Sequence, residues 1–119
     1  MLVDTSIWID HVRRPEPRLI VVLDANEVEV HPFVIGELAC GRLRPRDELT
    51  ELLGRLPSLP AVDHEEALIF LERHRLYGRG VGWIDLHLLA STMLARTSLW
   101  TRDRQMAAIA RELHIDLHG

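Results

Sequence analysis

The sequence contains no lysine, only one cysteine and no long apolar run. All 14 basic residues are therefore arginine, which binds phosphate and carboxylate groups bidentately more readily than lysine does. Because Cys40 is alone, an internal disulfide is excluded and a reducing compartment is expected. We expect Cys40 itself to be a small core residue. Residues 19–23 form an apolar run as long as any in the chain, far short of the roughly 20 residues that cross a membrane.

The amino-terminal residues show no basic segment before an apolar stretch, so no secretory signal is predicted and a cytoplasmic protein without membrane contact is expected. A length of 119 residues with 47% hydrophobic residues predicts one domain over residues 1–119. The net charge of −4 argues weakly against a nucleic-acid partner. Cations bound by gathered acids would, however, reverse the local field.

Short apolar bursts alternate with helical patterns along the chain. Strands are predicted at residues 2–3, 27–30, 98–101 and 115–117. Helices are predicted at residues 5–12, 18–25, 32–40, 45–56, 63–77, 83–95 and 103–113. The glycine-rich residues 78–82 are predicted to form a flexible loop. This alternation indicates an α/β fold, a parallel sheet with helices on both faces, in which ligands bind beyond the carboxyl ends of the strands.

Four carboxylates stand out in this pattern: Asp4, Glu37, Asp85 and Asp103. Each aspartate has a plain alternative role, because an aspartate at the start of a helix commonly caps it. Glu37 fits that alternative least well, since it lies within a predicted helix among apolar neighbours, where a lone buried carboxylate is costly. Hard oxygen ligands at such an edge suit Mg²⁺, with Mn²⁺ as an alternative.

Four segments, "VDTSIWID", "GELACG", "GVGWIDLHLLAS" and "WTRDRQM", carry these acids in order. Together they resemble the acidic motifs of the PIN-domain ribonucleases, and within them the VapC-type toxins of toxin–antitoxin pairs. The resemblance covers nearly the whole chain. It implies a single PIN-like domain with a short central parallel sheet of four to five strands. It also implies an Mg²⁺-dependent endoribonuclease that cleaves RNA, transfer or ribosomal RNA in the family, through metal-activated water. A homodimer and a VapB-like antitoxin are the implied partners.

Under this hypothesis all four acids are catalytic, with Asp4, Asp85 and Asp103 as metal ligands and Glu37 orienting water or adding a ligand. We expect Ser6 and Thr101 to hydrogen-bond these ligands or water, with local helix capping as the alternative role. The candidate RNA contacts are Arg42, Arg79, Arg102 and Arg104.

One position departs from the family pattern. Many relatives carry a second acid two residues after the last motif aspartate, where this chain has Gln105. The number of bound metal ions is therefore left open.

The three tryptophans, Trp8, Trp83 and Trp100, neighbour the acidic motifs, and we interpret them as core residues in preference to base-stacking ones. Asp10 is expected on the surface of the first helix.

Other acidic α/β proteins fit less well. A receiver domain needs a lysine in its Mg²⁺ pocket, and a haloacid-dehalogenase-type phosphatase needs an acid at the position of Ser6. A non-catalytic module that binds RNA or a partner, and a DNA-cutting relative, stay open as alternatives.

Overall fold

Two adjacent parallel strands, β1 (Leu2–Val3) and β2 (Leu99–Trp100), lie at the centre of the protein. The structure is a computed structural model that describes all residues, 1–119. Leu2 pairs with Leu99 and Val3 with Trp100. Single parallel bridges continue the pairing outward, from Leu2 to Glu29, from Val30 to Ser58 and from Leu99 to Leu117.

The predicted sheet of four to five strands is thus present as two regular strands and isolated bridges. Proline explains part of the shortness, because it cannot donate a ladder hydrogen bond. Pro57 and Pro60 flank the bridge at Ser58, and Pro32 opens a helix two residues after Val30.

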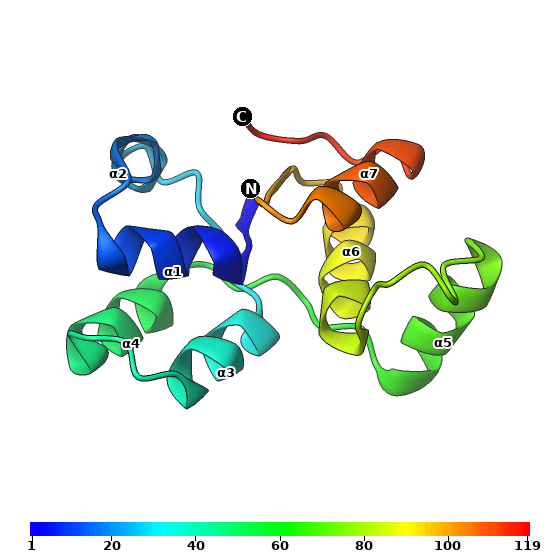
Figure 1. Ribbon diagram of the computed structural model, residues 1–119, viewed down its shortest axis with the longest axis horizontal. Coiled ribbons are helices and arrows are strands. Elements are labelled where there is room, and N and C mark those ends of the chain that lie inside the picture. The colour runs from blue at the N-terminus through cyan, green and yellow to red at the C-terminus, as the bar shows by residue number, and fades with distance from the viewer.

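Seven helices surround the strands and make the fold mixed α/β, as predicted. They are α1 (Thr5–Arg13), α2 (Pro17–Asp24), α3 (Pro32–Cys40), α4 (Arg46–Arg55), α5 (His64–Arg73), α6 (Trp83–Ala95) and α7 (Arg104–Glu112). Helices α1 to α4 lie to one side of the strands, and α5, α6 and α7 lie to the other (Figure 1). None of these helices is long and apolar enough to span a membrane.

Helix α5 shows how local sequence sets an element's start and how tertiary packing sets its end. Asp63 and Glu66 form the expected capping box, in which each side chain accepts from the other residue's backbone N–H. The helix ends at Arg73, four residues before the predicted end at residue 77. Arg75 adopts a left-handed conformation with φ of +52°, and Leu76 then turns into the core with 2% of its surface exposed.

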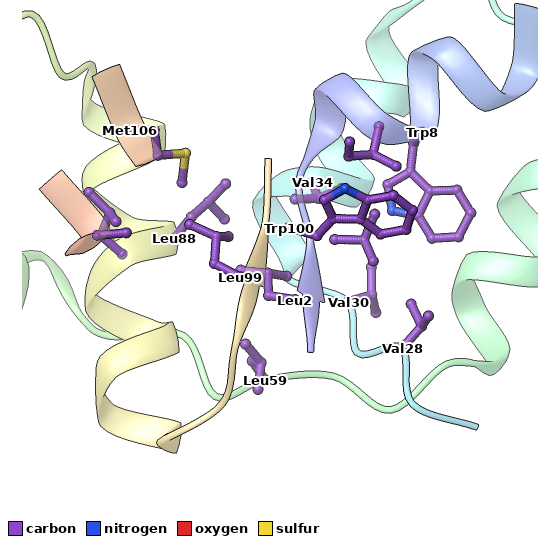
Figure 2. Close-up of a cluster of buried hydrophobic side chains, with 14 of the residues drawn as sticks. Leu2, Trp8, Val28, Val30, Val34, Leu59, Leu88, Leu99, Trp100 and Met106 are labelled. Atoms are coloured by element: carbon purple, nitrogen blue, oxygen red, sulfur yellow. The ribbon is translucent and has the colours of Figure 1, made fainter. Parts of the chain in front are cut away.

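The core gathers around the paired strand residues, with Leu2 and Leu99 side by side and Leu88 of α6 packed beside them (Figure 2). Trp8 and Trp100 are buried, as predicted. The core prediction is wrong for Trp83, which is 39% exposed in the first turn of α6. It is also wrong for Cys40, which is exposed because α3 buries the face of Val34 and Leu38, and Cys40 lies about 200° around the helix from Leu38.

Replacing Leu99 by alanine should destabilise the protein by about 2–5 kcal/mol, the range for truncating a fully buried leucine. The matched control is Leu94→Ala, because Leu94 is 63% exposed. Urea unfolding of both variants measures the difference. Equal losses for the two variants would contradict the placement of β2 at the centre of the core.

Candidate active site

Asp4 is the most firmly held of the four acids. It directly follows β1, and its N–H donates to the Trp100 carbonyl at 2.9 Å, so that it continues the strand pairing. Its Oδ2 accepts hydrogen bonds from Thr101 Oγ1 at 2.6 Å and from Ser6 Oγ at 3.1 Å. Its Oδ1 accepts from the Thr5 N–H at 2.7 Å, which caps α1. Asp4 can therefore cap α1 and still belong to the candidate site. It is only 5% exposed.

Thr5 connects Asp4 with Glu37. While its N–H donates to Asp4, its hydroxyl donates to Glu37 Oε1 at 2.9 Å. Glu37 lies on an exposed face of α3, so the predicted helix contains it without burying it. No role for Thr5 is predicted from the sequence. The available signal was a hydroxyl residue directly after a strand-end aspartate.

Asp103 lies beside Asp4 because β1 and β2 end at the same edge. The Thr101 hydroxyl that donates to Asp4 also accepts from the Asp103 N–H at 3.0 Å. Asp103 caps α7, and its Oδ1 accepts from the N–H groups of Gln105 and Met106 at 2.9 and 3.2 Å. Asp103, like Asp4, thus caps a helix and also lies in the candidate site.

Asp85 differs from the other acids, because it caps nothing. Gly82 is the N-cap of α6, and Asp85 lies in the first turn. Burial, together with repulsion from Asp4, Asp103 and Glu37, raises the pKa of Asp85 to about 6. Asp4, Glu37 and Asp103 therefore all act electrostatically on Asp85, although the four acids come from four separate parts of the chain.

The donor chemistry of this group fits a hard divalent cation. Carboxylate oxygens are the preferred ligands of such ions, and Asp85, one oxygen of Asp103 and one of Glu37 accept no protein hydrogen bond. The spacing is wider than an ion requires, since no three His, Cys, Asp or Glu side chains lie close enough together to hold one. The arrangement is thus a mutually repelling acidic cluster with free oxygens.

His31 fixes the helix of Glu37 relative to the helix of Asp85. Its Nδ1 accepts from the Phe33 N–H at 3.0 Å and caps α3, so the proton on Nε2 is directed at Ser91 Oγ of α6, 3.1 Å away. Burial lowers the pKa of His31 to about 4, with a smaller contribution from His87. Both histidines are buried in the interior of the protein.

Two of the four candidate RNA-binding arginines already have carboxylate partners. Arg102 donates to Asp10 and to Glu16, the latter at 2.7 Å, and Arg79 pairs with both oxygens of Glu112 at 2.5 and 2.8 Å. Asp10 lies on α1, as predicted, but serves in this ion pair. Arg42 and Arg104 are exposed and make no ion pair.

The two largest of the open hollows in the surface differ in their relation to the acids. One, of about 560 Å³, borders the acids because Glu37 lines it together with Phe33, Trp83 and Ile84. The other, of about 520 Å³, lies between α5 and α6 and contains none of the four acids. Only the first can contribute to chemistry at the acidic cluster.

Comparison with known proteins adds to this geometry. The family model described as "PIN domain" matches residues 1–112. "Ribonuclease VapC32" of Mycobacterium tuberculosis, from strains CDC 1551 / Oshkosh and ATCC 25618 / H37Rv, is 43% identical over 118 residues, which cover 98% of this chain and 95% of that protein.

Two solved structures resemble the fold. "Structure of FitAB bound to IR36 DNA fragment" has a TM-score of 0.64 at 17% identity, over 98% of this chain and 92% of that one. "Crystal Structure of FitAcB from Neisseria gonorrhoeae" has a TM-score of 0.63 at 16% identity, over 99% and 96%. At this identity the likeness concerns the fold alone.

In EDTA, Asp85→Asn should stabilise the protein above about pH 6 and have little effect near pH 4. A carboxyl group whose pKa is raised in the folded state binds more protons folded than unfolded between its ordinary pKa of 3.8 and about 6, so stability falls as pH rises through that window. Thermal unfolding of both proteins across pH measures the effect. His31 contributes the opposite slope to both, so their difference isolates Asp85. A pH-independent difference would contradict the electrostatic origin.

Arg102→Gln should lower the melting temperature at low ionic strength, because it leaves Asp10 and Glu16 without their shared cation. The difference from the wild type should shrink near 1 M salt, where the Debye length is about 3 Å. Arg104→Gln is the matched control, since Arg104 is exposed and makes no ion pair. Identical salt profiles for the two variants would argue against the ion pair.

Proposed function

Since the chain belongs to the PIN-domain family and, within it, to the VapC-type ribonucleases, we propose that it is an Mg²⁺-dependent endoribonuclease. In this proposal it is the toxin of a toxin–antitoxin pair. Its substrate is a structured RNA, of the transfer or ribosomal class.

The observation that carries the proposal is geometric: the Thr101 hydroxyl joins Asp4 and Asp103 at the edge where β1 and β2 end, and Thr5 joins Asp4 to Glu37. The raised pKa of Asp85, caused by burial and by repulsion from the other three acids, supports it. Such repulsion costs stability and is relieved by a bound cation. A purely structural role would need no such cluster.

The proposed metal ligands are Asp4, Asp85 and Asp103, with Glu37 as a further ligand or as the residue that orients water. Mg²⁺, when bound, would lower the pKa of a water molecule and offset charge on the phosphodiester. Thr101 and Ser6 hold Asp4 Oδ2, and Thr5 holds Glu37, so the hydroxyl groups fix the carboxylates in the orientation from which they bind.

Arg42 and Arg104 are the proposed phosphate contacts, because their exposed guanidinium groups are free to bind. Arg104 adjoins Asp103, and Arg42 follows the helix that carries Glu37. Arg79 and Arg102 would have to exchange a carboxylate partner for a phosphate, so their part in RNA binding is the smaller one.

An antitoxin and a second copy of the chain are the proposed protein partners. The resemblance to VapC-type toxins supports the antitoxin, as does the curated relative's name. Exposed apolar residues on α5 and α6, including Ile69 and Leu94 at 57% and 63%, are available for such contacts. Cytoplasmic location is part of the same proposal, since the RNA substrates are there.

A non-catalytic module that binds RNA or a partner remains the second candidate. The observation in its favour is that the acids, as placed, do not form a closed metal-binding group.

The deciding experiment incubates the purified protein with total bacterial RNA in Mg²⁺, in Mn²⁺ and in EDTA. We expect cleavage only with metal, and a loss of about a hundredfold or more in Asp4→Asn and Asp85→Asn, at or above the effect of removing a partner of a metal ligand. The readout is the RNA fragment pattern and rate.

The matched control is Asp24→Asn, because Asp24 is an exposed aspartate at the end of α2. It should cleave at the wild-type rate. Folded protein that binds RNA and leaves it intact in both metals would overturn the nuclease proposal in favour of the binding module.

A further inference from the structure

Gln105 stands where many relatives of this kind carry an acid, and its side chain contacts the backbone of Arg79. We propose that Gln105 is a positioning residue, which holds residues 78–82 (the glycine segment) against α7 and thereby fixes the start of α6, where Asp85 lies. The effect on catalysis rests on the proposed nuclease function. The attachment itself does not.

The contact with the segment is direct. The Gln105 side-chain Nε2 donates to the backbone carbonyl of Arg79. The Arg79 guanidinium reaches the other end of α7 and pairs with both oxygens of Glu112. One residue of the glycine segment is thus tied to the first and the last turn of the same helix.

Gly80 makes this attachment possible. Its φ of +78° is a conformation that side chains rarely adopt. A Cβ at this position would lie 2.8 Å from Gln105 Nε2 and 2.9 Å from Oε1, closer than real contacts allow. The Gln105 amide therefore lies directly over the backbone of Gly80, and the segment and the side chain fit each other.

The segment leads straight into the acidic cluster. Gly82 is the N-cap of α6 and offers no side chain to close the first turn, which depends on the bond from the Leu86 N–H to the Gly82 carbonyl at 3.0 Å. Asp85 lies within that turn. Further along α6, Ser91 is held by His31, so the start of the helix is the part that the segment must fix.

The competing interpretation makes Gln105 a weak substitute for the missing acid, facing a metal. Its Nε2 is occupied by the Arg79 carbonyl, and Asp85 receives its repulsion from Asp4, Asp103 and Glu37. The two interpretations predict opposite results for Gln105→Glu. If Gln105 holds the segment, the new carboxylate cannot donate to the Arg79 carbonyl and the segment is released. If Gln105 is a substitute metal ligand, the negative charge strengthens metal binding.

The first test is limited digestion by trypsin, which cuts after Arg79 in the segment. In Gln105→Ala, cleavage after Arg79 should become about two- to tenfold faster, as expected for the loss of one hydrogen bond. Cleavage after Arg42, in the loop that follows α3, is the internal reference and should not change. Arg111→Gln, an exposed position of α7, is the control variant.

A second readout follows Trp83, which directly succeeds the segment. Trp8 and Trp100 are at most 2% exposed and Trp83 is 39% exposed, so acrylamide quenches mainly Trp83. Quenching should increase in Gln105→Ala and Gln105→Glu. Unchanged digestion and unchanged quenching in both variants would overturn the proposal, whether or not the wild type cleaves RNA.

The third readout is RNA cleavage by the full-length variants. Gln105→Ala and Gln105→Glu should lower kcat about ten- to a hundredfold, up to the scale of a 1 Å misplacement at an active site, and leave KM near the wild-type value. A higher kcat in Gln105→Glu with slower cutting after Arg79 would assign Gln105 to the metal site and overturn the positioning role. If the wild type does not cleave RNA but the variants show faster digestion after Arg79, the proposed nuclease function is wrong and the positioning role of Gln105 stands.

Discussion

The parallel pairing of β1 with β2 is the interaction on which the rest of the structure depends. It involves only two residues on each strand, yet it joins positions 2–3 to positions 99–100 and buries all four side chains. The pairing continues for one more step, from the Asp4 N–H to the Trp100 carbonyl, and this step places a carboxylate and the Thr101 hydroxyl at the same edge. A sheet this short is stabilised by the side chains around it, since the backbone contributes few hydrogen bonds. The core and the acidic cluster are therefore two consequences of one pairing.

In the acidic cluster, some carboxylates are held by hydrogen bonds while one is repelled by its neighbours. Hydroxyl groups and helix-capping N–H groups satisfy Asp4 and one oxygen of Asp103, while Asp85 receives no such compensation and shows the raised pKa. Hydrogen bonds thus hold Asp4, Glu37 and Asp103 in position, whereas the repulsion raises the pKa of Asp85. The supports come from backbone groups and neutral hydroxyls, so they add no positive charge that would compete with a cation. Functional sites commonly concentrate perturbed groups in this way.

The sequence predicted the element types, the α/β class and the family, because apolar periodicity and proline placement are local signals. Helices α3 and α6 match their predicted bounds, and the Asp63 cap is present as expected. The errors have a common cause, which is long-range packing. The end of α5 depends on Leu76 reaching the core, and the exposure of Trp83 and Cys40 depends on which helix face finds a partner. The ordered acids could be found in the sequence, whereas the carboxylate partners of Arg79 and Arg102 lie 33 and 86 or more residues away.

The distance along the chain between Asp4 and Thr101 has a consequence for the order of folding. Their hydrogen bond spans 97 residues, and the strand that pairs with β1 begins only at Leu99. A chain that lacks residues 99–101 lacks the β2 partner of β1 and the Thr101 hydroxyl that donates to Asp4. Non-local strand pairing also forms late in folding, because the intervening chain must first be ordered. The acids can therefore gather only once residues 99–101 have joined β1.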